Sequence, residues 1–420
     1  MSQARELANL RSIPTNGNIL LDSTAGDGLQ SGGTCNIAAG LNALGAATTG
    51  DDNIAIGRLA IGTGVTTGTG NIAMGPSAGL KITSGTNNIS MGLTAADALL
   101  TGTDNISIGR LAFSASTDGA DNIAIGRSAL AVSGNDADCN IAIGLSALGG
   151  ADVSGLANIA IGALSADAMT TGICNVAIGV NALGASTTGC KNIAIGELAL
   201  GAAVTTGNDN VAIGTSAMDA ATSAAQNVAI GLNALGASTA TNYSVAIGHT
   251  AMGGADTTGI DNIAIGRNSA DALTSGICNI AIGKDALGTV NTGCFNIAIG
   301  NAAGASVTTT GCTINIGCGA NQTTECVACI VAVCVMAPIF TATSDCRSKK
   351  DIKDLPYGLD FINLLRPVSY KWKPQADKLD KDGNLLEKGE GAHTHQRTMF
   401  GLLGQQVREA TKKLGLNYND

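Results

Sequence analysis

The sequence is poor in the large side chains from which globular cores are usually built. Only 10 of its 420 residues are aromatic (5 Phe, 4 Tyr and 1 Trp), and charged residues make up 13%. Aromatic side chains supply much of the buried area of an ordinary core, so such a core is excluded for most of the chain. With 6 Pro and no three-residue period, the 58 Gly residues do not indicate collagen either.

Further classes are excluded by what the chain lacks. Its net charge of −9 argues against nucleic-acid binding. Residues 1–18 are polar and contain no apolar signal segment. The most apolar run, 326–340, is shorter than the span of about 20 residues that a membrane helix needs, so no membrane insertion is expected. Without an export signal, the 12 Cys suggest reduced thiols and intracellular assembly.

Composition divides the chain near residue 344. Residues 345–420 carry 14 basic and 11 acidic residues and six of the ten aromatic ones, whereas residues 1–344 carry 9 basic and 21 acidic residues. The longer part is rich in Ala, Ile, Val and Gly, and the mean hydropathy of the chain is +0.25. We therefore expect many thin, close-packed layers, followed by a small globular domain.

One pentapeptide, Asn-Ile-Ala-Ile-Gly or a close variant, recurs along most of the chain. Its second residue is Ile or Val, its third Ala or Ser and its fifth Gly in all sixteen copies, which follow one another every 17 or 18 residues. A unit of this length is too short for helix-pair repeats, which need about 33 residues or more. The first residues of the copies are Asn36, Asn53, Asn71, Asn88, Asn105, Asn122, Asn140, Asn158, Asn175, Asn192, Asn210, Asn227, Ser244, Asn262, Asn279 and Asn296.

The alternation within the motif predicts a short strand in every copy. Both Ile side chains would lie on one face and the Ala on the other, and the Gly would form a corner. The second half of a unit, such as residues 182–185, is expected to form a second short strand. Each copy then forms one coil of a β-solenoid, and sixteen coils give a rod of roughly 75 Å. The Asn residues would form a ladder of side-chain amides; plain turn residues are the alternative.

The small third residue of the motif has two interpretations. Close approach of another surface along a common axis would require it, and this interpretation favours several packed copies, most simply three. Alternatively, Ala fills a narrow solenoid interior. The first interpretation is preferred here because a thin, Gly-rich coil buries little area by itself.

The repeat resembles two groups of known proteins. Residues 242–248, Asn-Tyr-Ser-Val-Ala-Ile-Gly, are similar to the motif in the β-roll heads of trimeric autotransporter adhesins. The Asn-x-Ala-Ile-Gly pattern also resembles the repeats of phage and large-virus fibres. An adhesin would need a signal peptide and a C-terminal membrane barrel. The sequence indicates neither, so the fibre resemblance is the stronger one.

The cysteines do not indicate a metal or redox centre. Cys326 and Cys329 form a Cys-x-x-Cys pair, but in a β-branched strand they would point to opposite faces, so zinc is only a minor alternative. Four others, Cys35, Cys139, Cys174 and Cys278, directly precede the motif Asn. Their shared register suggests a shared packing position.

The C-terminal residues predict a small α+β domain. Residues 358–365 have the spacing of a short amphipathic helix, residues 368–372 alternate as a strand, and residues 400–407 lead from a strand into a helix. The motifs are Ser344-Asp345-x-Arg347-x-Lys349, then Leu365-x-Pro367-Val368-x-Tyr370-x-Trp372, then Gly401 with Gln405 and Val407.

Their order resembles the intramolecular chaperone auto-processing domain of phage tail spikes, endosialidases and fibres. The resemblance implies a domain that trimerises, guides folding of the fibre and cuts itself off between Ser344 and Asp345. Lys349 would be the base that activates the Ser344 hydroxyl, since burial lowers the pKa of a Lys, and Arg347 would be a supporting residue. Gly404 and Gln406 depart from the family's Ala and Glu, and the domain is shortened.

The sequence therefore predicts a mostly β protein of four parts. These are an N-terminal segment 1–34, a β-solenoid 35–318, a β-rich stem 319–344 and a chaperone domain 345–420. We expect a homotrimeric virion fibre or tail spike whose partners are itself, other virion proteins and a host-surface glycan or receptor. Its activity would be at most one autocatalytic Ser–Lys cleavage, without cofactor or metal. The alternatives are a cellular adhesin-like surface protein and a glycan-degrading tail spike, which would need paired carboxylates and aromatic platforms.

Overall fold

In the computed structural model, the chain divides into two units, residues 1–335 and 336–420. The structure describes residues 16–29, 32–134, 137–321, 323–324, 328–330, 367–370, 378–379, 385–387, 399–402 and 413. The named elements among them are all strands. The helices predicted over 358–365 and after 402 lie outside the described residues.

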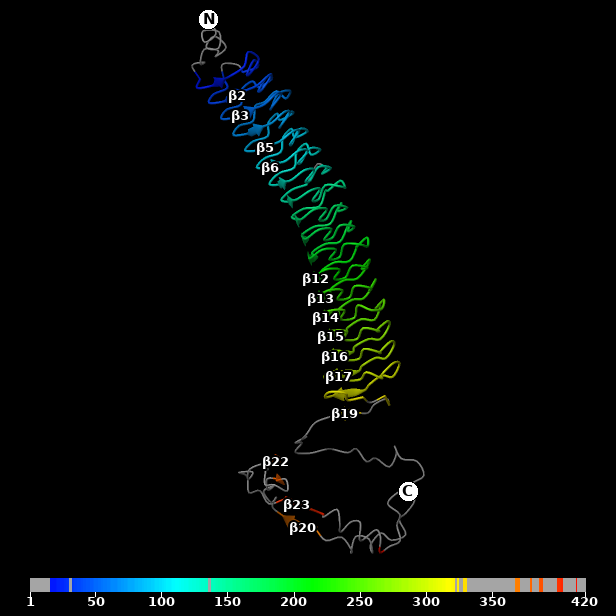
Figure 1. The fold of residues 1–420 in the computed structure, drawn as a ribbon. Helices are drawn as coiled ribbons and strands as arrows, with labels where there is room; N and C mark the ends of the chain where they lie inside the picture. The colour runs from blue at the N-terminus through cyan, green and yellow to red at the C-terminus, as the bar shows by residue number, and fades with distance from the viewer. Residues whose placement is uncertain are drawn as a thin grey trace. The chain divides into compact units, whose positions relative to one another are not determined.

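The first unit is a parallel β-solenoid in which one coil stacks on the next (Figure 1). Each motif copy forms one three-residue strand, which pairs in register with the strands of the preceding and following coils, as Ile106↔Ile123 and Ile108↔Ile125 show. The predicted solenoid with one motif copy per coil is confirmed. The strands are β1 Ile19–Leu20, β2 Ile37–Ala39, β3 Ile54–Ile56, β4 Ile72–Met74, β5 Ile89–Met91, β6 Ile106–Ile108, β7 Ile123–Ile125, β8 Ile141–Ile143, β9 Ile159–Ile161, β10 Val176–Ile178, β11 Ile193–Ile195, β12 Val211–Ile213, β13 Val228–Ile230, β14 Val245–Ile247, β15 Ile263–Ile265, β16 Ile280–Ile282, β17 Ile297–Ile299, β18 Ile314–Ile316 and β19 Ala328–Ile330.

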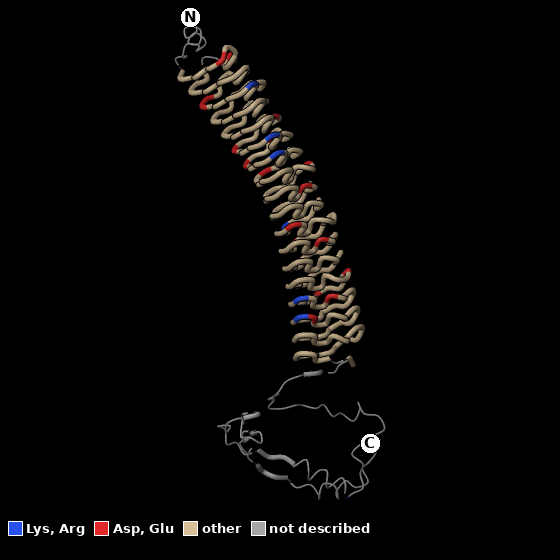
Figure 2. Tube along the Cα trace, in the orientation of Figure 1, with Lys and Arg blue, Asp and Glu red and all other residues tan. Residues whose placement is uncertain are grey.

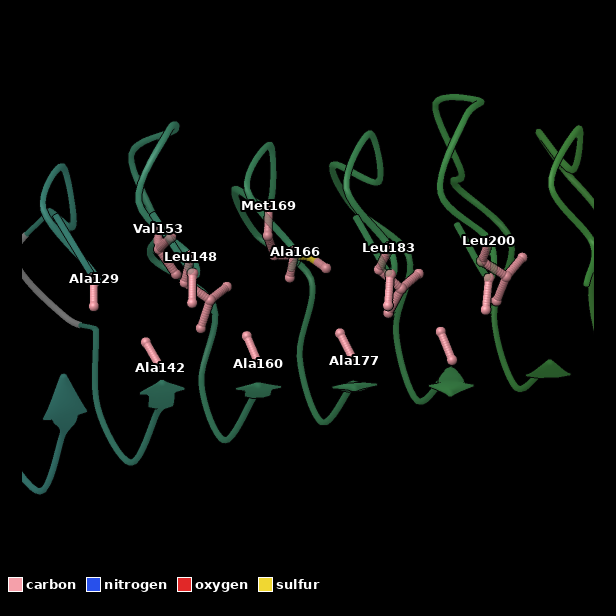
Figure 3. Close-up of a cluster of buried hydrophobic side chains, with 14 of the residues drawn as sticks. Ala129, Ala142, Leu148, Val153, Ala160, Ala166, Met169, Ala177, Leu183 and Leu200 are labelled. Carbon is pink, nitrogen blue, oxygen red and sulfur yellow. The ribbon is translucent and has the colours of Figure 1, made fainter. Parts of the chain in front are cut away.

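The third residue of each motif points into the solenoid. Ala142, Ala160 and Ala177 are fully buried and face the Leu and Met side chains of the opposite wall (Figure 3). The preferred interpretation of the small third residue is therefore wrong. Ala is required because the interior of one coil is narrow, not because a second surface approaches that side.

Most coils fill their interior with one large side chain taken from either of two positions, and two coils bury a second one, Val153 or Val290. Most coils place it eight residues after the motif Asn, as with Leu183 and Leu200. Where that position is Ala or Gly, a large residue three positions later is buried instead, as Met169 is in the coil of Ala166. The same exchange pairs Ala96 with Leu99, so interior volume is conserved although the sequence varies.

The second half of the coil is not a strand. Residues 180–185 form turns, in which Asn181 and Leu183 have φ of 54° and 51°. The prediction of a second strand over 182–185 is therefore wrong, because these residues alternate between left-handed and other conformations and cannot form an extended ladder. Their backbone still bonds to the next coil, for example from the Leu183 amide to the Ala199 carbonyl at 3.0 Å.

The motif Asn residues form the predicted ladder inside the column. The side-chain oxygen of Asn71 accepts bonds from the backbone and side-chain amides of Asn88, at 3.1 and 3.0 Å. The side-chain amide of Asn88 also donates to the Gly102 carbonyl at 2.8 Å. Each Asn thus bonds to the coils on both sides, and it is buried, as few plain turn residues are.

The motif Gly is required by its conformation and by the coil stacked on it. Gly92 has φ of +136°, and a Cβ there would lie 2.7 Å from the carbonyl oxygen of Gly109, the Gly of the next coil. Both conditions exclude any larger residue, which explains the invariant fifth position.

Candidate functional site

The predicted cleavage site lies outside the described residues. This holds for Ser344, Asp345, Arg347 and Lys349, so the expected proximity of the Ser and Lys side chains stays a prediction. Cys326 of the Cys-x-x-Cys pair is also outside the described residues, whereas Cys329 lies in β19, where the sequence predicts a strand.

In the second unit, strands from two of the C-terminal motifs described above, 365–372 and 401–407, lie side by side. Strand β20, Pro367–Tyr370, pairs antiparallel with β23, Met399–Leu402, so that Val368 faces Gly401. The paired residues Val368 and Gly401 are 33 positions apart in sequence, and their pairing joins the two motifs in one sheet. A second antiparallel pair is formed by β21, Lys378–Leu379, and β22, Leu385–Glu387. The predicted strand at 368–372 and the strand that begins near 400 are confirmed over these bounds.

The outward face of the solenoid strands is a continuous apolar surface. The second and fourth motif residues point outward, and Ile56, Ile108 and Ile178 expose 36–38% of their area. This pattern continues through seventeen consecutive strands, β2 to β18, about 80 Å at 4.8 Å per strand. We call these two columns of side chains the Ile face. Their large size in nearly every copy is the sequence signal for an interaction surface, because a soluble monomer rarely exposes an apolar stripe of such length.

Charged residues are sparse on the column, as Figure 2 shows. Among the described residues, the structure forms a single ion pair, between Lys284 and Asp285 at 3.1 Å. A search of the same residues finds no group of three or more His, Cys, Asp or Glu side chains placed to hold a metal ion. No helix in the described part of the chain is long and apolar enough to cross a membrane.

Four Asp side chains share one partly buried position, nine residues after the motif Asn. Burial raises the pKa of all four carboxyls above the ordinary value of 3.8. The Asp219 carboxylate accepts a bond from the Ala202 amide of the preceding coil at 3.1 Å, which opposes part of that rise in pKa. One carboxylate oxygen in Asp167 and one in Asp271 has no hydrogen-bond partner. The four residues are Asp97, Asp167, Asp219 and Asp271.

The cysteines before the motif Asn do not occupy a packing position, so that interpretation is wrong. Cys35, Cys139 and Cys174 are exposed, and Cys278 is partly exposed. All four have φ between 56° and 58°, at the corner that leads into the strand. The corner conformation turns these side chains toward solvent, which residue spacing alone could not reveal.

Aromatic side chains of the coils do not gather at one place. Phe113 is buried, whereas Tyr243 and Phe295 are exposed by 57% and 55% and stand at the same corner position three coils apart. A glycan-degrading site would need such platforms beside paired carboxylates. That alternative gains no support from the described residues.

Comparison with known proteins gives a family match for the C-terminal part. Residues 344–416 match the family model described as the chaperone of endosialidase. No curated protein and no solved structure is found to match the chain. The match begins at Ser344 and includes β20 to β23. The chain therefore joins a parallel β-solenoid of the fibre or tail-spike type to a C-terminal segment similar to the chaperone of endosialidase.

Proposed function

We propose that the chain is a structural protein of a virion, a homotrimeric fibre or tail spike that its own C-terminal segment assembles. The observation that carries this proposal is the family match over 344–416, which follows the solenoid strands β1 to β19 in the sequence. The solenoid supplies length and a repetitive surface, and the chaperone-like segment supplies association of three chains. Other virion proteins and a host-surface glycan or receptor would be its further partners.

A separate assembly domain has a physical reason in this fold. Successive coils present nearly identical contacts, so a slip of one whole coil between chains would cost little energy. Bringing distant coils together in register also carries an entropic cost of loop closure. A globular trimer at one end would fix the register once, and the coils could then add from it.

We further propose that the chaperone segment is released by one cut between Ser344 and Asp345. The start of the family match at Ser344 supports this position. Lys349, with a pKa lowered by burial, would accept the proton of the Ser344 hydroxyl as that oxygen attacks the carbonyl carbon of the peptide bond to Asp345. It would pass this proton to the departing Asp345 amine as the C–N bond breaks, and water would then hydrolyse the ester. Arg347 would support the arrangement. The cut occurs once per chain, so the protein would perform no turnover of an external substrate.

Intact mass tests both proposals in one preparation. Mass under denaturing conditions should show wild-type chains that end at Ser344, and native mass should show three of them. Ser344→Ala and Lys349→Ala should give soluble trimers that keep their C-terminal segment. An uncut wild type would refute the cleavage, and a monomeric wild type would refute the trimer.

Deletion of residues 345–420 tests the chaperone role. If the segment is needed only for assembly, the deleted chain should aggregate or associate out of register, whereas the Ser344→Ala chain should remain soluble. A deleted chain that gives the same soluble oligomer as wild type would refute the role.

A further inference from the structure

The two edges of the Ile face carry charges that vary together. We define the leading edge as the residue directly before each motif Asn and the trailing edge as the residue directly after each motif Gly. Seven coils carry Asp, Glu, Lys or Arg on either edge, and five of them carry opposite charges on both. The five pairs are Asp52 with Arg58, Asp104 with Arg110, Asp121 with Arg127, Lys191 with Glu197, and Asp261 with Arg267.

The paired charges do not meet within one chain. All ten side chains are exposed, and the strand between the two members of a pair spans about 10 Å. Among the described residues the single ion pair is Lys284 with Asp285, so none of the five pairs forms an ion pair within its own coil. A relation between the two edges must therefore be satisfied by contacts outside the chain.

The pair Lys191 and Glu197 is the informative one, because its basic residue is on the leading edge and its acidic residue on the trailing edge. Copying one ancestral repeat would reproduce Asp-Asn-Ile-x-Ile-Gly-Arg, but it would not place Lys191 and Glu197 in the same coil with both signs exchanged. In the coil of β18 the two edges carry the same residue type instead of opposite charges. Cys312 occupies the leading position and Cys318 the trailing position, and both are exposed. Two coils depart from the pattern, with Asp209 opposite Thr215 and Lys284 opposite Cys278.

Symmetry connects these edges. When identical columns run parallel around a common axis with their Ile faces inward, the leading edge of one chain meets the trailing edge of the next. When two columns pack antiparallel, like edges meet, and Asp would face Asp. With no axial offset, each coil meets its own counterpart, so Asp104 lies beside Arg110 of the next chain and Lys191 beside Glu197.

We propose that the Ile face is the contact surface between copies of this chain, parallel and in register, with leading and trailing edges paired coil by coil. The inference rests on the proposed self-association and names the surface, direction and register. Exposed ion pairs add little affinity, but like charges brought together are unfavourable, so the edges favour the register that the C-terminal segment sets, while the Ile face supplies burial. A shift by one coil would set Lys191 against Thr215 instead of Glu197.

Zero-length cross-linking tests this arrangement on the full-length protein. A carbodiimide joins a Lys amine to a carboxylate in direct contact, so wild type should yield covalent multimers on a denaturing gel that contain a Lys191–Glu197 link. Glu197→Gln should remove that link. Arg110→Lys should add a link to Asp104, whereas Arg110→Lys with Asp104→Asn should not.

The position of the new link reports the register. A link from Lys at position 110 to Asp121 instead of Asp104 would show a one-coil shift and overturn the register. If native mass shows multimers but neither the Lys191–Glu197 link nor the link from position 110 to Asp104 forms, the Ile face is not the contact surface between chains, although the proposed self-association stands. Capture of the Ile face by a different protein would have the same meaning. A monomer would overturn both.

Discussion

Removing one Asn side chain from the ladder should open the solenoid locally, and the chain itself contains the compensating exchange. The Asn227 side-chain oxygen accepts a bond from the Ser244 amide at 3.0 Å, and its amide donates to the Thr241 carbonyl at 2.8 Å. Asn227→Ala leaves both of these buried backbone groups without that partner. At about 1–3 kcal/mol for each buried unsatisfied group, the free energy of local opening should fall by about 2–6 kcal/mol.

One natural coil shows how Ser can replace Asn. At position 244 the Ser hydroxyl accepts a bond from the Asn262 amide at 3.2 Å, which replaces the acceptor. The missing donor is supplied by Thr241, whose hydroxyl bonds to the Gly259 carbonyl at 2.6 Å. In the coil before, Ala224 occupies the position of Thr241 and is likewise buried.

Three variants therefore form a graded series. Asn227→Ser keeps the acceptor and should lose about 1–3 kcal/mol, about half the effect of Asn227→Ala. Asn227→Ser with Ala224→Thr restores the donor and should return to within about 1 kcal/mol of wild type. Hydrogen exchange of the β13 and β14 amides measures local opening, and a loss of 2 kcal/mol accelerates exchange roughly thirty-fold. Equal exchange in all variants, or no recovery in the double variant, would refute the ladder as a source of stability.

Three other perturbations follow from the interior, the Gly corner and the buried carboxyls. Ala160→Leu should cost about 1–3 kcal/mol by overpacking a full interior, whereas the outward Ile161→Leu should cost much less in the same denaturation experiment. Gly92→Ala should lose at least about 1–3 kcal/mol from backbone strain, and Gly319→Ala, with no atom within 4 Å of its added Cβ, should lose less. Because burial raises the pKa of Asp219, the folded chain binds that proton more tightly than the unfolded chain, and wild-type stability should rise as pH falls through this raised pKa and level off below about 3.8. Asp219→Asn should show less of this rise in thermal melts between pH 7 and pH 3.8, and an unchanged pH dependence would contradict the assignment.

The sequence predicts the solenoid because its strongest constraints are local and repeated. Alternation of Ile and Ala defines the two strand faces, and the Gly at the fifth motif position indicates a corner. The φ values of these Gly residues, near +135°, agree with that corner. The sequence could not predict which face was crowded. A small residue suits both a narrow interior and a close neighbour, and only the position of Leu183 or Met169 opposite the Ala shows that the interior is responsible.

The conformation of the turns was also beyond sequence reasoning. Leu, Ser and Cys do not ordinarily favour positive φ, so Cys35 and Leu183 gave no signal of left-handed corners. The paired edge charges were visible in the sequence, but their meaning depends on knowing that both members point outward from opposite ends of one strand. For Ser344 and Lys349, motif order supplied the prediction, and their geometry lies outside the described residues.

The left-handed residues have a consequence for how the column begins to form. Most coils hold three non-Gly residues at positive φ, including bulky ones such as Ile61 and Phe113 at 44° and 50°. At about 1–2 kcal/mol per residue, a coil without neighbours is strained by about 3–6 kcal/mol before any contact compensates it. Formation of the first coil is therefore rare, whereas further coils form readily on an existing end. Folding should show a lag that a preformed end abolishes, and a short array should be disproportionately unstable.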